Sequence, residues 1–217
     1  MKVTYKNLRI KIFAVILIAT AGVIGYLVYK DLTTSPRMPE SIPQAVAADA
    51  PVKSDPPNDN EKKTYTVPAV HPRRLIINKI NVDALIKPVG VLSGGTLDAP
   101  KTAWDAGWYE KSGLPGENGV PLLLDGHVND ALNAAGVFFQ LNTLKPGDSL
   151  TVERGDGQMI GYDVTKVDML PDDKVDMRSL LAPNSSRPTL VIITCGGIYD
   201  RLAKTYTDRV IIHAEKV

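Results

Sequence analysis

The stretch TLVIITCGG, residues 189–197, carries the strongest strand pattern in the C-terminal half of the chain. Its apolar run 190–193 is typical of a buried strand, and the single cysteine of the chain, Cys195, stands just before two glycines. A cysteine where a buried strand opens into a Gly-Gly loop lies at a rim, where small residues let a substrate backbone approach. By itself the pattern also fits a buried structural cysteine.

Short apolar or alternating runs recur from about residue 67 onward. They predict strands over residues 74–79, 82–86, 120–124, 149–153, 160–169, 189–194 and 209–215. Gly- and Asp-containing turn signals separate the runs, and only residues 131–144 leave room for a longer helix. Seven or eight short strands in roughly 150 residues predict a mainly β domain over 67–217, folded as a closed or nearly closed barrel with short helices.

The N-terminus has the composition of a membrane anchor. Residues 12–29 contain no charge, and as a helix rising ~1.5 Å per residue they would span about 27 Å, close to the hydrocarbon thickness of a bilayer. Basic residues without any acid precede this run, so the positive-inside rule predicts a cytoplasmic segment 1–11 and an extracellular domain. The alternative is a cleaved signal peptide, although its cleavage-like site at 45–47 lies far beyond the apolar run.

Residues 30–66 contain six prolines among polar residues and show no helical or strand period. This composition cannot bury a core and predicts a disordered, Pro-rich linker between membrane and domain.

The overall charge and the cysteine count exclude several classes of site. The net charge of +1 gives no field that would attract nucleic acid, so we expect no nucleic-acid partner. One cysteine forms no internal disulfide, and the spacing of His, Cys and carboxylates indicates no metal site. No phosphate-binding Gly-rich loop follows a strand, and we expect no cofactor.

A cysteine nucleophile needs a nearby base or cation to hold the thiolate. Of the three histidines, His127 directly follows the predicted strand 120–124 and therefore lies at a strand exit, as Cys195 does. His71 lies at the edge of the domain and His213 inside the last strand. Position along the strands favours His127 as the partner of Cys195.

Acyl transfer also needs donors that stabilise an oxyanion. Arg209 starts the last predicted strand, and its guanidinium offers several fixed N–H donors. If the strands of Cys195 and Arg209 are antiparallel neighbours, both side chains reach the same rim. Arg201 and Arg187 are interpreted as solvated surface charges.

Taken together and in this order, these segments resemble the sortase family. Residues 126–128 are similar to its histidine motif, 190–195 to its Thr-Leu-x-Thr-Cys nucleophile strand, and 209–214 to its arginine strand. The segments 74–84, 106–109 and 114–119 are similar to other parts of the family, and the resemblance covers about residues 70–215. The Thr-Cys-Gly-Gly end and the Trp-Tyr element look most like class F, with class E next.

The resemblance implies a membrane-anchored cysteine transpeptidase that cleaves a Leu-Pro-x-Thr-Gly-like sorting signal between Thr and Gly. Cys195 would attack the carbonyl, His127 protonate the leaving amine, and Arg209 hold the substrate or the oxyanion. Gly196 would bind substrate, and Thr194 would either order the end of its strand or contact substrate. A cell-wall or pilin amine would then resolve the thioester, so that surface proteins with the signal and these amines are the implied partners.

The sequence departs from the family pattern in its apolar strand and at one acid. Val191 and Ile192 stand where the hallmark has Thr and Leu. Asp125 stands where a small or apolar residue is expected, and either favours the imidazolium form of His127 or faces solvent. Two other functions remain open: an L,D-transpeptidase-like peptidoglycan cross-linker, whose Ser-x-Gly-Cys-x-Arg arrangement is absent, and a non-catalytic stalked binding domain with a core cysteine.

Overall fold

The computed structural model describes residues 23, 45–46, 55–184 and 186–217. The predicted segments 1–11 and 12–29 lie outside these residues except for Val23, and no helix within the described part is long and apolar enough to cross a bilayer. The helices are α2 (Asp59–Thr64), α3 (Met177–Leu180) and the 3-10 turns η1 (Asn78–Ile80), η2 (Leu141–Thr143) and η3 (Asp172–Lys174). The strands are β1 (Ala45–Val46), β2 (Pro72–Ile77), β3 (Val82–Val89), β4 (Thr96–Leu97), β5 (Ala106–Tyr109), β6 (Leu122–Gly126), β7 (Ser149–Arg154), β8 (Met159–Pro171), β9 (Thr189–Asp200) and β10 (Thr205–Lys216).

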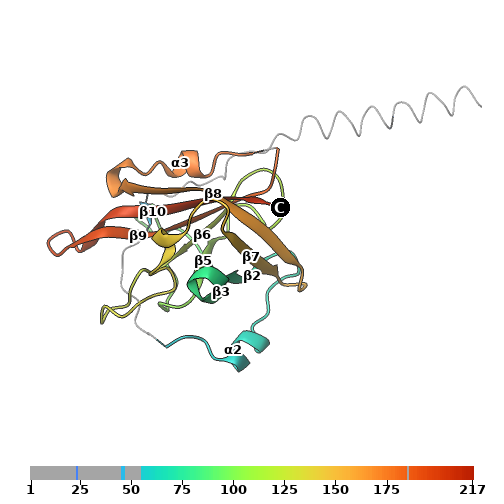
Figure 1. Ribbon diagram of the computed structural model, residues 1–217, viewed down its shortest axis with the longest axis horizontal. Helices are drawn as coiled ribbons and strands as arrows, with labels where there is room; N and C mark the ends of the chain where they lie inside the picture. Colours follow the sequence, from blue (N-terminus) through green and yellow to red (C-terminus); the bar gives the residue numbers. More distant parts are fainter. Residues whose placement is uncertain (1–22, 24–44, 47–54, 185) are drawn as a thin grey trace, which may run out of the picture. The chain divides into compact units, whose positions relative to one another are not determined.

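Eight of these strands close into a barrel in the order β10-β8-β7-β2-β3-β5-β6-β9, as predicted. Neighbours are antiparallel except β3 with β5 and β6 with β9. The pair β1 and β4 forms a separate two-stranded parallel sheet. Figure 1 shows β9 and β10 side by side, projecting together beyond the barrel as a long hairpin. Full closure leaves no barrel strand with an unpaired edge.

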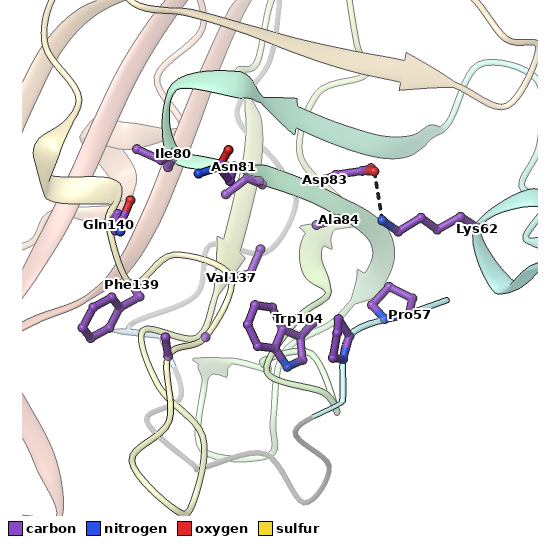
Figure 2. Close-up of a pocket in the computed structure, with 14 residues that line it drawn as sticks. Pro57, Lys62, Ile80, Asn81, Asp83, Ala84, Trp104, Val137, Phe139 and Gln140 are labelled. Carbon is purple, nitrogen blue, oxygen red and sulfur yellow. Dashed lines mark hydrogen bonds and ion pairs between the residues drawn. The ribbon is translucent and has the colours of Figure 1, made fainter. Parts of the chain in front are cut away.

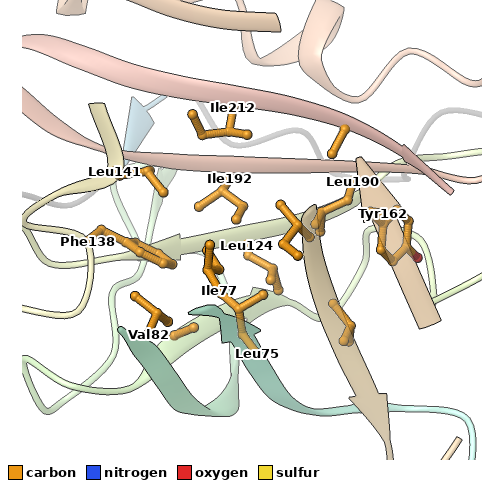
Figure 3. Close-up of a cluster of buried hydrophobic side chains, with 14 of the residues drawn as sticks. Leu75, Ile77, Val82, Leu124, Phe138, Leu141, Tyr162, Leu190, Ile192 and Ile212 are labelled. Atoms are coloured by element: carbon orange, nitrogen blue, oxygen red, sulfur yellow. The ribbon is translucent and has the colours of Figure 1, made fainter. Parts of the chain in front are cut away.

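The apolar runs of β6, β9 and β10 are continuous because both faces of these strands are buried. Alternate residues such as Leu124, Ile192 and Ile212 point into the barrel, where they join the main core (Figure 3). The residues between them, such as Leu123 and Ile193, join a second cluster on the outer face, which the segment around α3 covers. A strand buried on both faces carries no alternating pattern, which explains why these runs are the clearest signals in the sequence.

All seven predicted strands are present, but the structure differs from the sequence prediction in three places. β5, residues 106–109, is an additional barrel strand. The segment 131–144 forms no helix beyond the short turn η2. β9 does not end at Cys195 but continues to Asp200 and pairs with β10, whose first residue is Thr205 and not Arg209. The extension of β9 begins with two glycines and is exposed from residue 197 onward, so cross-strand pairing rather than a buried apolar pattern defines it.

Helix α2 lies within the stretch predicted as a disordered linker. Asn58 caps it, with Glu61 completing a capping box that satisfies the first backbone amides. The last turn of the helix is fixed to the barrel, since Lys62 pairs with Asp83 at 2.9 Å. The residue that follows the helix, Tyr65, is fixed as well, because its hydroxyl donates to the carbonyl of Ile86. The linker prediction is therefore wrong for residues 58–65, because proline content masked a local helix signal.

The segment before α2 crosses a cavity of about 320 Å³ on the barrel wall. Pro57, Trp104, Val137 and Phe139 line it, with the Lys62–Asp83 pair at its edge (Figure 2). None of the predicted site residues lies among its lining residues.

Thr194 holds β9 to β6 from inside the barrel. Its side chain is 1% exposed, and its Oγ1 donates to the carbonyl oxygen of Gly126 at 2.7 Å. Because side chains alternate along a strand, Thr194 points away from the face that carries Cys195. The hydroxyl therefore orders the end of the strand, which is one of the two roles expected for Thr194, and a substrate contact of this residue stays a prediction.

We expect Thr194→Val to lower the free energy of unfolding by about 1 kcal/mol, the usual net value of a buried hydrogen bond. Thr165→Val is the matched control, because Thr165 makes the same kind of bond to the carbonyl of His213 but is exposed. Denaturant unfolding of both variants measures the difference. Equal losses, or a loss confined to Thr165→Val, would contradict this role.

Candidate active site

The register of β9 against β10 places Cys195 directly opposite Arg209. The next pairs, Thr194 with Val210 and Ile193 with Ile211, keep the two strands in step. On both strands the same face then presents Cys195 and Arg209 beside the outer apolar cluster. The predicted antiparallel neighbourhood of nucleophile strand and arginine strand is confirmed.

The Arg209 side chain is 2% exposed, and its donors are almost fully engaged within the chain. Nη1 donates to the carbonyl oxygens of Tyr206 at 3.0 Å and Asp208 at 2.9 Å. Nη2 lies 3.4 Å from the hydroxyl of Thr205 and 3.0 Å from Oδ1 of Asp172. The Nε–H is buried and has no hydrogen-bond partner among the described residues. One N–H of the guanidinium is therefore left without a partner, although the buried Arg209 is not among the residues that line the cleft beside Cys195.

His127 lies one residue beyond β6 and is 8% exposed. Its Nε2 lies 2.8 Å from the carbonyl oxygen of Pro100. Since a carbonyl can only accept, Nε2 carries the proton of this bond, and Nδ1 is the nitrogen that gains or loses a proton. The Pro100 carbonyl thus orients the ring and selects its tautomer.

A cleft of about 700 Å³ opens on both Cys195 and His127. One wall is the segment 127–133 and the other is the β9–β10 hairpin, including Tyr199 and Tyr206. This volume lies within the range of sites that bind small molecules or a short peptide. The structure therefore joins the predicted cysteine and histidine at one open surface, which a buried structural cysteine would not require.

The charges around Cys195 oppose one another. Burial raises the pKa of its thiol, the guanidinium of Arg209 lowers that pKa, and the carboxylates of Asp172 and Asp125 raise it. The net shift is upward, so the resting side chain is a thiol at neutral pH. Thiolate formation must then accompany proton transfer or substrate binding.

The other histidines lie elsewhere. His71 packs edge-on against Trp108 with ring centroids 4.9 Å apart. His213 lies 3.3 Å from Asp168, and burial lowers its pKa although that carboxylate raises it. Neither histidine lines the cleft of Cys195.

Among the remaining arginines, Arg187 forms a loose surface pair with Glu215 at 3.9 Å, in agreement with the surface charge predicted for it. Arg201 is exposed in the hairpin turn, yet it lines the cleft. Gly196 follows Cys195 inside β9 rather than in a loop, and substrate binding by Gly196 stays a prediction.

Sequence reasoning missed Asp172, Pro100 and Tyr206. Asp172 reaches Arg209 from η3, and Pro100 reaches His127 from the loop after β4, through contacts that no local pattern encodes. The carbonyl of Tyr206 accepts from Arg209, and only the extended hairpin reveals this neighbour. The one sequence signal for this contact is the short spacing between Tyr206 and Arg209.

Comparisons with known proteins agree with this geometry. The sequence model of the Sortase domain family matches residues 75–217. Among solved structures, sortase C-1 from Actinomyces oris is 27% identical, covers 66% of this chain and 72% of its own, and has a TM-score of 0.52. A comparison with curated protein sequences finds no match.

Two further structures are similar in fold. The lid mutant of sortase A from Corynebacterium diphtheriae is 20% identical over 71% of this chain and 73% of its own, with a TM-score of 0.53. Sortase D5 from Clostridium perfringens is 21% identical over 74% and 89%, with a TM-score of 0.50. The family match spans more than half of the chain and favours neither an L,D-transpeptidase nor a binding domain. The chain therefore belongs to the sortase family of cysteine transpeptidases.

Proposed function

We propose that this sortase cleaves a Leu-Pro-x-Thr-Gly-like signal between Thr and Gly and transfers the acyl part to a cell-wall or pilin amine. The observation that carries the proposal is the cleft that Cys195 and His127 both line, together with the direct cross-strand pairing of Cys195 with Arg209. A nucleophile, a proton carrier and a donor for the oxyanion are the three groups that acyl transfer needs.

In the first half-reaction, the sulfur of Cys195 attacks the threonine carbonyl carbon and its proton passes to Nδ1 of His127. The C–N bond then breaks, the imidazolium returns the proton to the leaving glycine amine, and a thioester remains. In the second half-reaction the acceptor amine attacks the thioester and gives up a proton to the imidazole. The C–S bond then breaks, and the imidazolium returns this proton to the sulfur of Cys195. The resting thiol fits this sequence, because its proton is the one that the leaving amine needs.

Arg209 serves as the donor through its Nε–H. The bonds of Nη1 and Nη2 to the hairpin and to Asp172 fix the guanidinium plane. A preorganised donor in a buried site stabilises a developing oxyanion without reorganising at the moment of reaction. The unpartnered Nε–H supports this assignment, since a buried donor left unsatisfied is costly unless a ligand completes it.

The proposal extends to the class of sortase and to the place of the protein at the membrane. The Thr-Cys-Gly-Gly end and the Trp108-Tyr109 element support class F, with class E next. Segment 12–29 would anchor the chain as a single span with its N-terminus in the cytoplasm and the barrel outside. Gly196 would allow the substrate backbone close to Cys195. Surface proteins that carry the signal would be the acyl donors.

We expect Cys195→Ala to abolish cleavage and transfer of an LPxTG peptide while leaving the fold intact, because one small side chain replaces another. Turnover of a fluorogenic peptide, with and without an added amine, measures activity, and thermal unfolding checks the fold. Substantial cleavage by the folded variant would falsify the proposed function.

His127→Ala should reduce turnover by roughly 10²–10⁴-fold, the usual contribution of a general acid–base group. His71→Ala and His213→Ala are matched controls, because neither ring lines the cleft, and both should keep most of the activity. Steady-state kcat/KM of the three variants decides the matter. A loss at His213 equal to that at His127 would mean that the wrong imidazole has been assigned.

Arg209→Lys keeps the positive charge but removes Nε and the planar fork. We expect single-turnover acylation of Cys195 to slow by roughly 10²-fold or more, as when an oxyanion donor is lost. Arg187→Lys is the surface control and should acylate normally. If Arg201→Lys is impaired and Arg209→Lys is not, the donor is the arginine of the hairpin turn.

A further inference from the structure

The turn of the β9–β10 hairpin carries two basic side chains that the proposed mechanism does not use. Arg201 and Lys204 are exposed in this turn, and both line the cleft into which Cys195 opens. Neither side chain forms an ion pair or a hydrogen bond with another residue in the described part of the chain. Their two positive charges are therefore free to meet a ligand in the cleft.

The acidic residues near these cations are already engaged. Asp130 is the one acid among the described residues that line the cleft, and it is 4% exposed. Its Oδ1 accepts from the backbone amides of Leu132 at 2.9 Å and Ala134 at 2.8 Å. Asp200, which precedes the hairpin turn, accepts in the same way from two amides of that turn. The hairpin end of the cleft therefore carries an unbalanced positive charge.

The backbone of Lys204 indicates that its side chain matters. Its φ is 54°, in the left-handed region that glycine and asparagine adopt more readily than lysine. The turn does not depend on this side chain, because the carboxylate of Asp200 already holds two amides of the turn. A residue kept in a costly backbone conformation is a candidate for function.

The two cations lie at a definite distance from the thiol. Lys204 precedes Arg209, the cross-strand partner of Cys195, by five residues, which is roughly 17 Å at a strand's rise of ~3.3 Å per residue. Tyr199 and Tyr206 line the cleft between the two ends, with ring centroids 5.2 Å apart. An extended peptide advances by about the same rise, so its fourth or fifth residue from the thiol would reach the cations.

We propose that Arg201 and Lys204 form a subsite for a carboxylate that a substrate carries about four or five residues from the reacting carbonyl. The inference rests on the proposed function, because it adds a binding group to the same cleft. A guanidinium and an ammonium both donate to carboxylate oxygens. Since the cations lie far from the bond that breaks, they act on substrate binding and leave the chemical step unchanged. The carboxylate belongs to the acyl-donor peptide or to the amine acceptor.

The first arm of the test examines the acyl donor. Peptides that contain Leu-Pro-x-Thr-Gly carry Glu either four residues before the threonine or four residues after it, and each is compared with its Gln counterpart. If the donor supplies the carboxylate, the full-length protein should show a KM roughly two- to fivefold lower for one Glu peptide, the scale of partly exposed ion pairs. The kcat values of the Glu and Gln peptides should be equal.

The second arm examines the acceptor. A five-residue glycine peptide with a free C-terminal carboxylate is compared with its C-terminal amide, because such a chain spans roughly 17 Å. If the acceptor supplies the carboxylate, the ratio of transfer to hydrolysis should favour the acid by the same factor, and the Glu and Gln donors should behave alike. A wild type that distinguishes the acid from its neutral counterpart in neither arm would overturn the inference.

Variants assign the preference to the two cations. Arg201→Gln and Lys204→Asn should each weaken it, the double variant should abolish it, and Lys204→Arg should keep it. Arg187→Gln is the matched control, because this arginine lies outside the cleft. Added salt should also weaken the preference, since the Debye length falls from about 10 Å at 0.1 M to about 3 Å at 1 M. A preference that survives in the double variant would overturn the inference.

Thermal unfolding separates binding from a structural role of the lysine. Lys204→Asn should melt at the same temperature as the wild type or higher, because asparagine adopts the left-handed conformation more readily. A lower melting temperature would assign Lys204 to the fold of the turn and overturn its place in the subsite.

Binding to folded Cys195→Ala needs no turnover and separates the inference from the proposed function. Isothermal titration compares the acidic and neutral forms of each peptide on this full-length variant, with and without Arg201→Gln and Lys204→Asn. A preference for the acid that needs both cations, in a protein whose wild type cleaves no sorting peptide, would retain the subsite and reject the proposed function. Normal cleavage without any preference for an acid would do the reverse.

Discussion

The site depends on the register in which β9 lies between β6 and β10. That register pairs Cys195 with Arg209 on one side and Thr194 with Gly126 on the other. A slip of one residue would turn every side chain of β9 to the opposite face and place the thiol inside the barrel. Burial of β6, β9 and β10 on both faces makes such a slip expensive, because each face packs against its own apolar cluster.

With the strands in this register, the burial and the charges around Cys195 decide whether it rests as a thiol or as a thiolate. The charge of Arg209 favours a thiolate at Cys195, but Asp172 already binds Nη2 of this arginine, and burial acts against the thiolate. A site of this kind rests in the neutral form and becomes charged only when a substrate brings its own donors and acceptors. The same low-dielectric surroundings strengthen the one donor left open, the Nε–H of Arg209.

The sequence predicted the barrel because buried strands leave continuous apolar runs, and it placed Cys195, His127 and Arg209 because each adjoins such a run. It did not predict the hairpin extension of β9, since residues 196–200 begin with two glycines, are exposed or half-buried, and are ordered by cross-strand pairing. Gly197 illustrates this, with φ of 74° and the side chain of Asp208 where a Cβ would be. Helix α2 was missed because a capping box outweighed proline-rich flanks, and the contacts of Asp172 and Pro100 arise only from the folded chain.

The central claim is that Cys195 carries the acyl group in a site assembled by this register. The most direct test is the mass of the acid-quenched full-length protein during turnover of a peptide that contains Leu-Pro-x-Thr-Gly. We expect an adduct on Cys195 that ends at the threonine of the peptide and is released by hydroxylamine, as a thioester is. Cleavage without any adduct on Cys195, or an adduct on another residue, would contradict it.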